Sequence, residues 1–163
     1  MTLVAGFYDG NVAWIGGDSG AFEEDESVIL TETKVWKVDG FLVGACGGFR
    51  LAEIAYESGI GDPFKLRDHL EAWWNANSST QADNDTSFIV INQLGIWYIG
   101  EDFSVVRSKE NYGAIGWGKL PALAALLALN GIEMPPKIRI TKVLKASAYH
   151  TTKIRAPFKT VSL

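Results

Sequence analysis

The segment that decides the fold is residues 1–48, which read MTLVAGFYDG NVAWIGGDSG AFEEDESVIL TETKVWKVDG FLVGACGG. Short runs rich in β-branched and aromatic residues cover residues 3–7, 11–15, 34–38 and 40–45. The first two runs are separated by Asp9-Gly10 and the last two by Asp39-Gly40, and an Asp-Gly pair between such runs is typical of a hairpin turn. The segment therefore predicts two β-hairpins.

Thr2 is the candidate catalytic residue in this segment, because it directly follows Met1. Removal of Met1 gives Thr2 a free α-amine beside its hydroxyl group, and such a threonine can act as a nucleophile with its own amine as general base. A small residue after methionine suits removal by an aminopeptidase. With Met1 attached, the Thr2 nitrogen is an amide and cannot accept the proton.

Thr2 is followed by Gly17-Asp18-Ser19, by Lys34 and by the pattern Gly44-x-x-Gly47-Gly48. Asp18 lies sixteen positions after Thr2, and Lys34 lies sixteen positions after Asp18. This ordered pattern resembles the proteasome-type β-subunits, and in style it is most similar to the bacterial HslV type, the peptidase half of an ATP-dependent protease. The resemblance covers the first third of the chain closely and continues more weakly to the end.

The resemblance implies an N-terminal nucleophile (Ntn) hydrolase site made of Thr2, Asp18, Lys34 and Gly48. Lys34 would place a positive charge beside the Thr2 nucleophile, and Asp18 would hold Lys34 in place. The Gly48 amide would donate a hydrogen bond to the oxyanion of the tetrahedral intermediate. Alternatively, Asp18 and Lys34 form a structural ion pair, and the glycine pair is only a turn.

The remainder of the chain predicts helices over residues 49–56, from Pro63 onward, over 120–129 and from 136 to about 147, with strands over 87–92, 95–100, 103–107 and 157–163. Asp62-Pro63 is typical of a helix start. The two stretches 22–27 and 75–85 are expected to be loops. The first contains the acidic residues Glu23, Glu24, Asp25 and Glu26. We interpret these carboxylates as solvated, with a metal site as the weaker alternative.

Two features depart from the pattern of active relatives. Just before the helix at 120–129, those relatives usually carry a glycine-flanked serine near the threonine, and this chain has Trp117. Active relatives also usually carry an aspartate near the end of the last helix, but no acidic residue follows Glu133. His150 and Thr151 lie in that region, and no motif assigns the role to either of them.

Length and composition set the class of protein. A chain of 163 residues with an apolar fraction of 47% predicts one globular domain over residues 1–163. A net charge of −4 without a run of basic residues argues against nucleic acid or an anionic membrane as a partner. The single cysteine, Cys46, excludes an internal disulfide and favours a reducing compartment. With no signal peptide expected ahead of Thr2, we expect a cytoplasmic protein.

The resemblance implies an α+β fold, the four-layer αββα sandwich of two antiparallel sheets. It implies a threonine endopeptidase without cofactor or metal, which acts on unfolded polypeptide. It also implies a homo-oligomeric ring or stack, with an ATP-dependent unfoldase as a further partner. One alternative is a catalytically inactive assembly or interaction module. Another is an Ntn amidohydrolase for a small amide, which a pocket closed by Trp117 and Trp36 would favour.

Overall fold

The computed structural model describes residues 2–23, 26–29, 34–77 and 84–163. Eleven strands and four helices lie in these ranges. The strands are β1 (Leu3–Tyr8), β2 (Ala13–Gly17), β3 (Gly20–Glu23), β4 (Glu26–Ile29), β5 (Val35–Val38), β6 (Phe41–Cys46), β7 (Ser87–Asn92), β8 (Gly95–Ile99), β9 (Val105–Arg107), β10 (Tyr112–Gly116) and β11 (Lys159–Ser162). The helices are α1 (Phe49–Ser58), α2 (Pro63–Asn77), α3 (Lys119–Ala128) and α4 (Pro136–His150).

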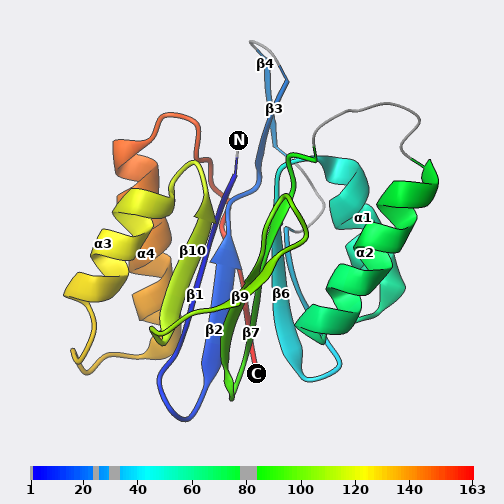
Figure 1. Cartoon of the computed structure of the whole chain (residues 1–163). Helices are drawn as coiled ribbons and strands as arrows, with labels where there is room; N and C mark the ends of the chain where they lie inside the picture. The colour runs from blue at the N-terminus through cyan, green and yellow to red at the C-terminus, as the bar shows by residue number, and fades with distance from the viewer. Residues whose placement is uncertain (1, 24–25, 30–33, 78–83) are drawn as a thin grey trace.

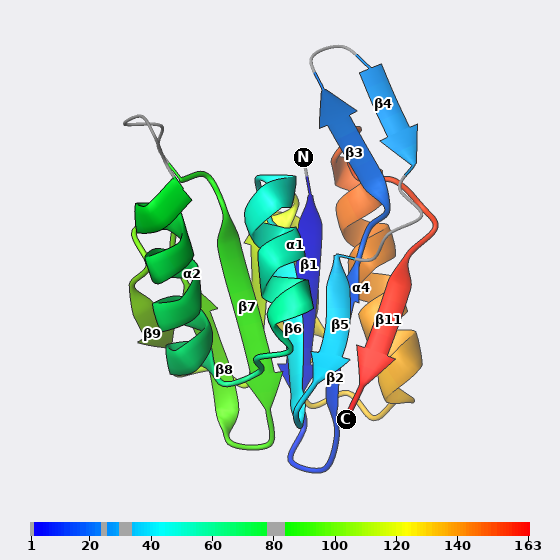
Figure 2. The same cartoon turned by 90° about the vertical axis from the view of Figure 1, so that its right-hand side faces the viewer.

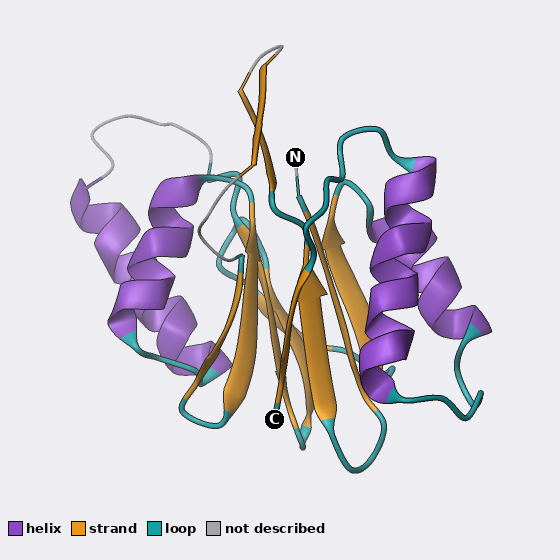
Figure 3. Ribbon diagram, turned by 180° about the vertical axis from the view of Figure 1, so that it is seen from behind, coloured by secondary structure: helices purple, strands orange, loops and turns teal. Residues whose placement is uncertain are grey.

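Two antiparallel sheets lie face to face between two pairs of helices (Figure 1). One sheet has the strand order β10-β1-β2-β11 and is covered on its outer face by α3 and α4. The other has the order β5-β6-β7-β8-β9 and is covered by α1 and α2, as the view from behind also shows (Figure 3). This arrangement confirms the predicted α+β class and the four-layer αββα sandwich.

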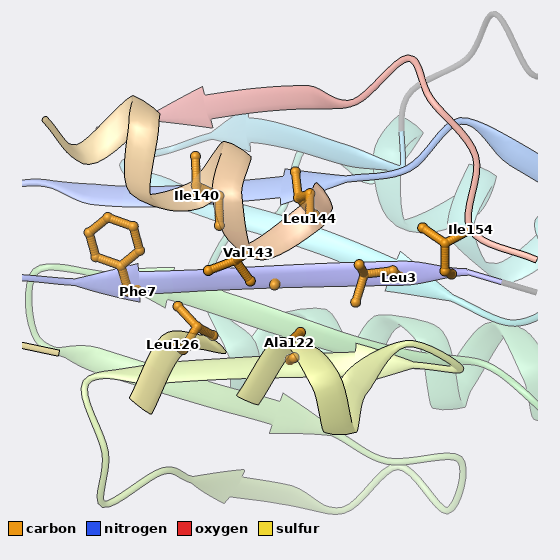
Figure 4. Close-up of a cluster of buried hydrophobic side chains, with 10 residues drawn as sticks. Leu3, Phe7, Ala122, Leu126, Ile140, Val143, Leu144 and Ile154 are labelled. Carbon is orange, nitrogen blue, oxygen red and sulfur yellow. The ribbon is translucent and has the colours of Figure 1, made fainter. Parts of the chain in front are cut away.

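Strand β1 is central to the sandwich, because both of its faces are buried. Leu3, Ala5 and Phe7 face α3 and α4, where they form one core with residues of both helices, including Leu126 and Leu144 (Figure 4). The intervening residue Val4 faces the second sheet and belongs to the core between the two sheets. Successive side chains of a strand point to opposite faces, so this strand joins two cores and fixes the position of Thr2 at its start.

The β3–β4 hairpin was not predicted, and part of the expected loop at 22–27 is strand. Glu23 pairs with Glu26 at the end of this two-stranded ribbon, while Glu24 and Asp25 lie outside the described residues. The ribbon projects beyond the sandwich at the end where the N-terminus lies (Figure 2). Backbone pairing within the hairpin therefore overrides the low strand preference of acidic residues.

Other boundaries also differ from the predictions. Strand β10 was missed, and α2 continues to Asn77, so the predicted loop at 75–85 begins too early. Residues 78–83 of that loop lie outside the described residues. The Asp62 cap is confirmed, because its carboxylate accepts hydrogen bonds from the amides of Phe64 and Lys65 at 3.1 and 3.0 Å. No helix in the described part of the chain is long and apolar enough to cross a membrane.

Candidate active site

Thr2 lies at the start of the central strand, and its side chain is nearly enclosed. Only 7% of the residue is exposed to solvent. Its carbonyl oxygen accepts a hydrogen bond from the amide of Trp117 at 2.8 Å, directly after β10 ends. Because β1 is paired with β10 on one side and β2 on the other, the backbone holds Thr2 in place from both directions.

Asp18 reaches the start of β1 because β2 runs antiparallel to it and ends there. Gly17, the last residue of β2, pairs with Val4, so Asp18 follows it opposite Leu3. The Leu3 amide donates to Asp18 Oδ1 at 2.8 Å, and the Asp18 amide donates back to the Leu3 carbonyl at 3.2 Å. The Gly20 amide donates to Asp18 Oδ2 at 3.0 Å, so both carboxylate oxygens are held by backbone.

Lys34 comes from the other sheet, one residue before β5. Its Nζ atom donates to Asp18 Oδ1 at 3.1 Å and also to the carbonyl oxygen of Gly20. Both charged side chains are buried, which makes this ion pair a link between the two sheets. Burial lowers the pKa of Lys34, and the neighbouring Asp18 carboxylate opposes that change.

Cys46 is a neighbour of this cluster that the sequence analysis did not assign to it. Burial raises the pKa of the Cys46 thiol, and the positive charge of Lys34 and a hydrogen bond from the Thr2 side chain oppose that change. The place of Cys46, at the end of β6 and directly before Gly47-Gly48, is the only sequence signal that could have found it. A mostly neutral thiol therefore lines the site beside the threonine hydroxyl.

Gly48 follows Cys46 by two residues, but its amide is already used. It donates to Asp85 Oδ1 at 3.0 Å and to Thr86 Oγ1 at 3.1 Å. Neither acceptor was a candidate in the sequence analysis, because both lie almost forty positions later in the chain. The structure thus places Asp18 and Lys34 beside the start of β1, where Thr2 lies, and gives the Gly48 amide two partners from the residues just before β7.

Trp117 contributes its backbone to the site and turns its side chain outward. The Trp117 residue is 65% exposed. Gly116, just before it, has a φ of +91°, and a Cβ atom there would lie 2.1 Å from the Thr2 carbonyl oxygen. Only glycine fits so close to the backbone of Thr2. Trp36 is 6% exposed and packs edge-on against Tyr56. A side chain as exposed as that of Trp117 does not close a pocket over Trp36.

The segment between α4 and β11 contacts the site through backbone carbonyl groups and has no acidic side chain. The Ser19 amide donates to the carbonyl of Arg155 at 3.1 Å, and its hydroxyl donates to the carbonyl of Pro157 at 2.6 Å. The late segment therefore fixes the residue next to Asp18 through backbone groups. Within the described ranges, no group of three or more His, Cys, Asp and Glu side chains is arranged to hold a metal ion.

Solved structures with this arrangement of elements come from HslV and related proteins. Thiobacillus denitrificans BPH in complex with epoxomicin matches with a TM-score of 0.83 and 16% identity, over 99% of this chain and 98% of that chain. Eukaryotic HslV from Trypanosoma brucei matches with a TM-score of 0.77 and 18% identity, over 99% and 98%. Anbu (ancestral beta-subunit) from Yersinia bercovieri matches with a TM-score of 0.76 and 10% identity, over 99% and 81%.

No family model matches the sequence, and no curated protein matches it either. At these levels of identity the structural similarity shows the fold. The resemblance inferred from the N-terminal pattern is therefore confirmed as a proteasome-like Ntn-hydrolase fold, and the roles of Thr2, Asp18, Lys34 and Gly48 stay predictions.

Proposed function

We propose that this chain, which has the fold of HslV-type and Anbu-type proteins, is a threonine-type peptidase that uses Thr2 after Met1 is removed. The observation that carries the proposal is the buried Asp18–Lys34 pair beside the first strand. Asp18 binds the Leu3 amide at 2.8 Å and Lys34 at 3.1 Å, so one carboxylate positions both the chain next to Thr2 and the cation.

In the proposed reaction, Thr2 Oγ bonds to the carbonyl carbon of the scissile amide while its proton moves to the Thr2 α-amine. The carbonyl π electrons move onto oxygen, and this oxyanion requires a donor such as the Gly48 amide. Collapse of the intermediate breaks the C–N bond, and the leaving amine takes the proton. Water then hydrolyses the threonine ester, which releases the acyl product and restores the hydroxyl.

Lys34 would supply the electrostatic part of this mechanism. A buried ammonium lowers the cost of the negative charge that develops on Thr2 Oγ, and it favours the neutral form of the α-amine, which must accept a proton. A model α-amine has a pKa of about 7.7–8.0, so a modest decrease leaves it mostly neutral at physiological pH. Asp18 keeps the cation in place through a charge-assisted hydrogen bond.

We further propose that the peptidase works in the cytoplasm on unfolded polypeptide, within an assembly of its own copies, and that an ATP-dependent unfoldase delivers substrate. A helical assembly of the Anbu complex from Pseudomonas aeruginosa is among the similar structures, with a TM-score of 0.75, which supports self-association as the first possibility to test. Size-exclusion chromatography with light scattering gives the molecular mass of that assembly directly.

A second function is a catalytically inactive assembly module. It is favoured by Trp117, which supplies a backbone amide to Thr2 but no hydroxyl where active relatives usually have serine, and by the lack of an acidic residue after Glu133. Such a protein would keep the Asp18–Lys34 pair for stability alone. The exposed Trp117 gives no support to the small-amide hydrolase, which would need a closed pocket.

Cleavage of an unfolded polypeptide separates these functions. Protein with Thr2 at its N-terminus should degrade fluorescently labelled casein, whereas protein that retains Met1 and the variant Thr2→Ala should not. Thr2→Ser is the matched control, because it keeps a hydroxyl nucleophile and should retain part of the rate. Equal rates for the Met1-free protein and Thr2→Ala would favour the inactive module.

A further inference from the structure

The amide of Gly48 is not free to bind a substrate in this structure. Its single proton is shared between Asp85 Oδ1 at 3.0 Å and Thr86 Oγ1 at 3.1 Å, and both distances lie in the normal range for N–H···O hydrogen bonds. An oxyanion at Thr2 would need this same proton. Asp85 and Thr86 are therefore competitors of the reacting oxygen.

The competitors are placed by the backbone. Cys46 pairs with Ser87 at the end of the β6–β7 ladder, and the segments that continue from the two strands stay in contact beyond this pair. Gly47 has a φ of +114°, and a Cβ atom there would lie 2.1 Å from the Asp85 carbonyl oxygen. Only glycine allows this approach, which brings the Gly48 amide against the side chains of the two residues before β7.

Asp85 also supplies a hydrogen-bond acceptor at the N-terminus of α1. Gly48 is the N-cap of α1, it has no side chain to cap the helix, and the first turn carries no acidic residue. A helix N-terminus favours a negative charge, and Asp85 brings one from a distant part of the chain. The negative oxygen of a tetrahedral intermediate would occupy the same kind of position, so the carboxylate imitates it.

We propose that Asp85, together with Thr86, masks the Gly48 amide and thereby slows the reaction at Thr2. This inference rests on the proposed peptidase function, because it concerns the donor that this reaction requires. The site becomes competent when the Asp85 carboxylate turns away and the substrate oxygen takes its place. Asp85 is thus an inhibitory residue that does not touch the substrate.

Asp85 is the half of the mask that can move. Asp85 is exposed, whereas Thr86 is 2% exposed and lies directly before β7. Asn84, the residue before it, accepts a hydrogen bond from the Thr86 amide at 2.9 Å and donates to the carbonyl of Glu101 at 2.8 Å. A partner that binds at the Asn84–Glu101 contact is therefore in a position to displace the carboxylate.

The test measures how fast epoxomicin, the compound bound to the similar BPH protein, modifies Met1-free protein. Asp85→Ala should raise the second-order rate constant about tenfold, because the carboxylate no longer competes for the proton of the Gly48 amide; a tenfold change corresponds to about 1.4 kcal/mol. Asp85→Asn, which keeps the acceptor oxygen without its charge, should give a smaller rise. Asp68→Ala removes an exposed carboxylate on α2 and should leave the rate unchanged.

Hydrogen exchange of the Gly48 amide, read by NMR, completes the test. The amide should be protected in the unaltered protein and should exchange faster in Asp85→Ala. If the unaltered protein reacts and Asp85→Ala reacts equally fast or more slowly, the masking is refuted and the peptidase proposal stands. If neither reacts although exchange shows that the amide is released, Thr2 is not a nucleophile and both proposals fail. If Asp85→Ala does not change the exchange of Gly48, the masking contact itself is refuted.

Discussion

Replacing Asp18 by asparagine tests the contact on which the site is built. Asp18 is 2% exposed, and its carboxylate accepts hydrogen bonds from Leu3, Gly20 and Lys34 at 2.8, 3.0 and 3.1 Å. Asparagine has one acceptor oxygen, so one of the two backbone amides loses its partner, at about 1–3 kcal/mol. Lys34 also becomes an unpaired buried cation. The total loss expected for breaking a buried ion pair is about 3–5 kcal/mol of unfolding free energy.

Urea denaturation followed by tryptophan fluorescence measures this loss. Asp68→Asn, on the exposed face of α2, is the matched control and should cost less than about 1 kcal/mol. Removing the cation as well, in Asp18→Asn/Lys34→Met, should recover part of the stability, because an apolar side chain replaces the unpaired charge. A loss below about 1 kcal/mol for Asp18→Asn, or a double variant equal to the sum of the single variants, would refute this reasoning.

Three further predictions concern pH, backbone strain and the residue beside Thr2. Burial lowers the pKa of Lys34, so the lysine loses its charge as pH rises, and the rate at which epoxomicin modifies Thr2 should fall with it. This fall should begin at a pH lower than about 10.4, the pKa of an ordinary lysine. Lys34→Arg should move the fall to higher pH in a pH–rate profile. Gly47→Ala should lower the urea midpoint by an amount equivalent to about 1–3 kcal/mol, since φ is +114° and the new Cβ atom meets the Asp85 carbonyl. Trp117→Ser should change the unfolding free energy by about 0.5 kcal/mol or less in the same assay, because the side chain is 65% exposed and only the backbone amide contacts Thr2.

Much of the fold was predictable because local rules determine it. Asp39 and Gly40 both have positive φ, as the predicted hairpin turn requires, and they join β5 to β6. The Asp62 carboxylate caps α2 as its place before Pro63 indicates. The spacing of Asp18 behind Thr2 corresponds to one hairpin, since β2 returns antiparallel along β1 and ends beside its start.

The strands that were missed depend on pairing with distant partners. Strand β10 reads YGAIG, and its glycine and alanine residues have little intrinsic strand preference. It is a strand because it pairs with β1 from Leu3–Gly116 to Phe7–Tyr112, which no local pattern reveals. In β3 and β4, Glu23 and Glu26 are paired across a hairpin, although acidic residues usually indicate a loop.

The missed parts of the candidate site have the same cause. Asp85 and Thr86 meet Gly48 only because β6 and β7 are neighbours in one sheet, and a carboxylate in a polar stretch gives no sign of that in the sequence. Cys46 was considered only for its redox state. Trp117 holds the position at which active relatives usually have a serine near the threonine, but nothing in the sequence indicated that its side chain is exposed.

Intact mass spectrometry of the protein before and after epoxomicin treatment tests the central claim most directly. We predict a mass that lacks Met1, and after prolonged treatment a gain of one epoxomicin per chain that peptide mapping places on Thr2. The adduct should be absent from Thr2→Ala and from protein that retains Met1. Met1-free, folded protein that gains no mass would contradict the account and would leave the inactive assembly module as the better explanation of this fold.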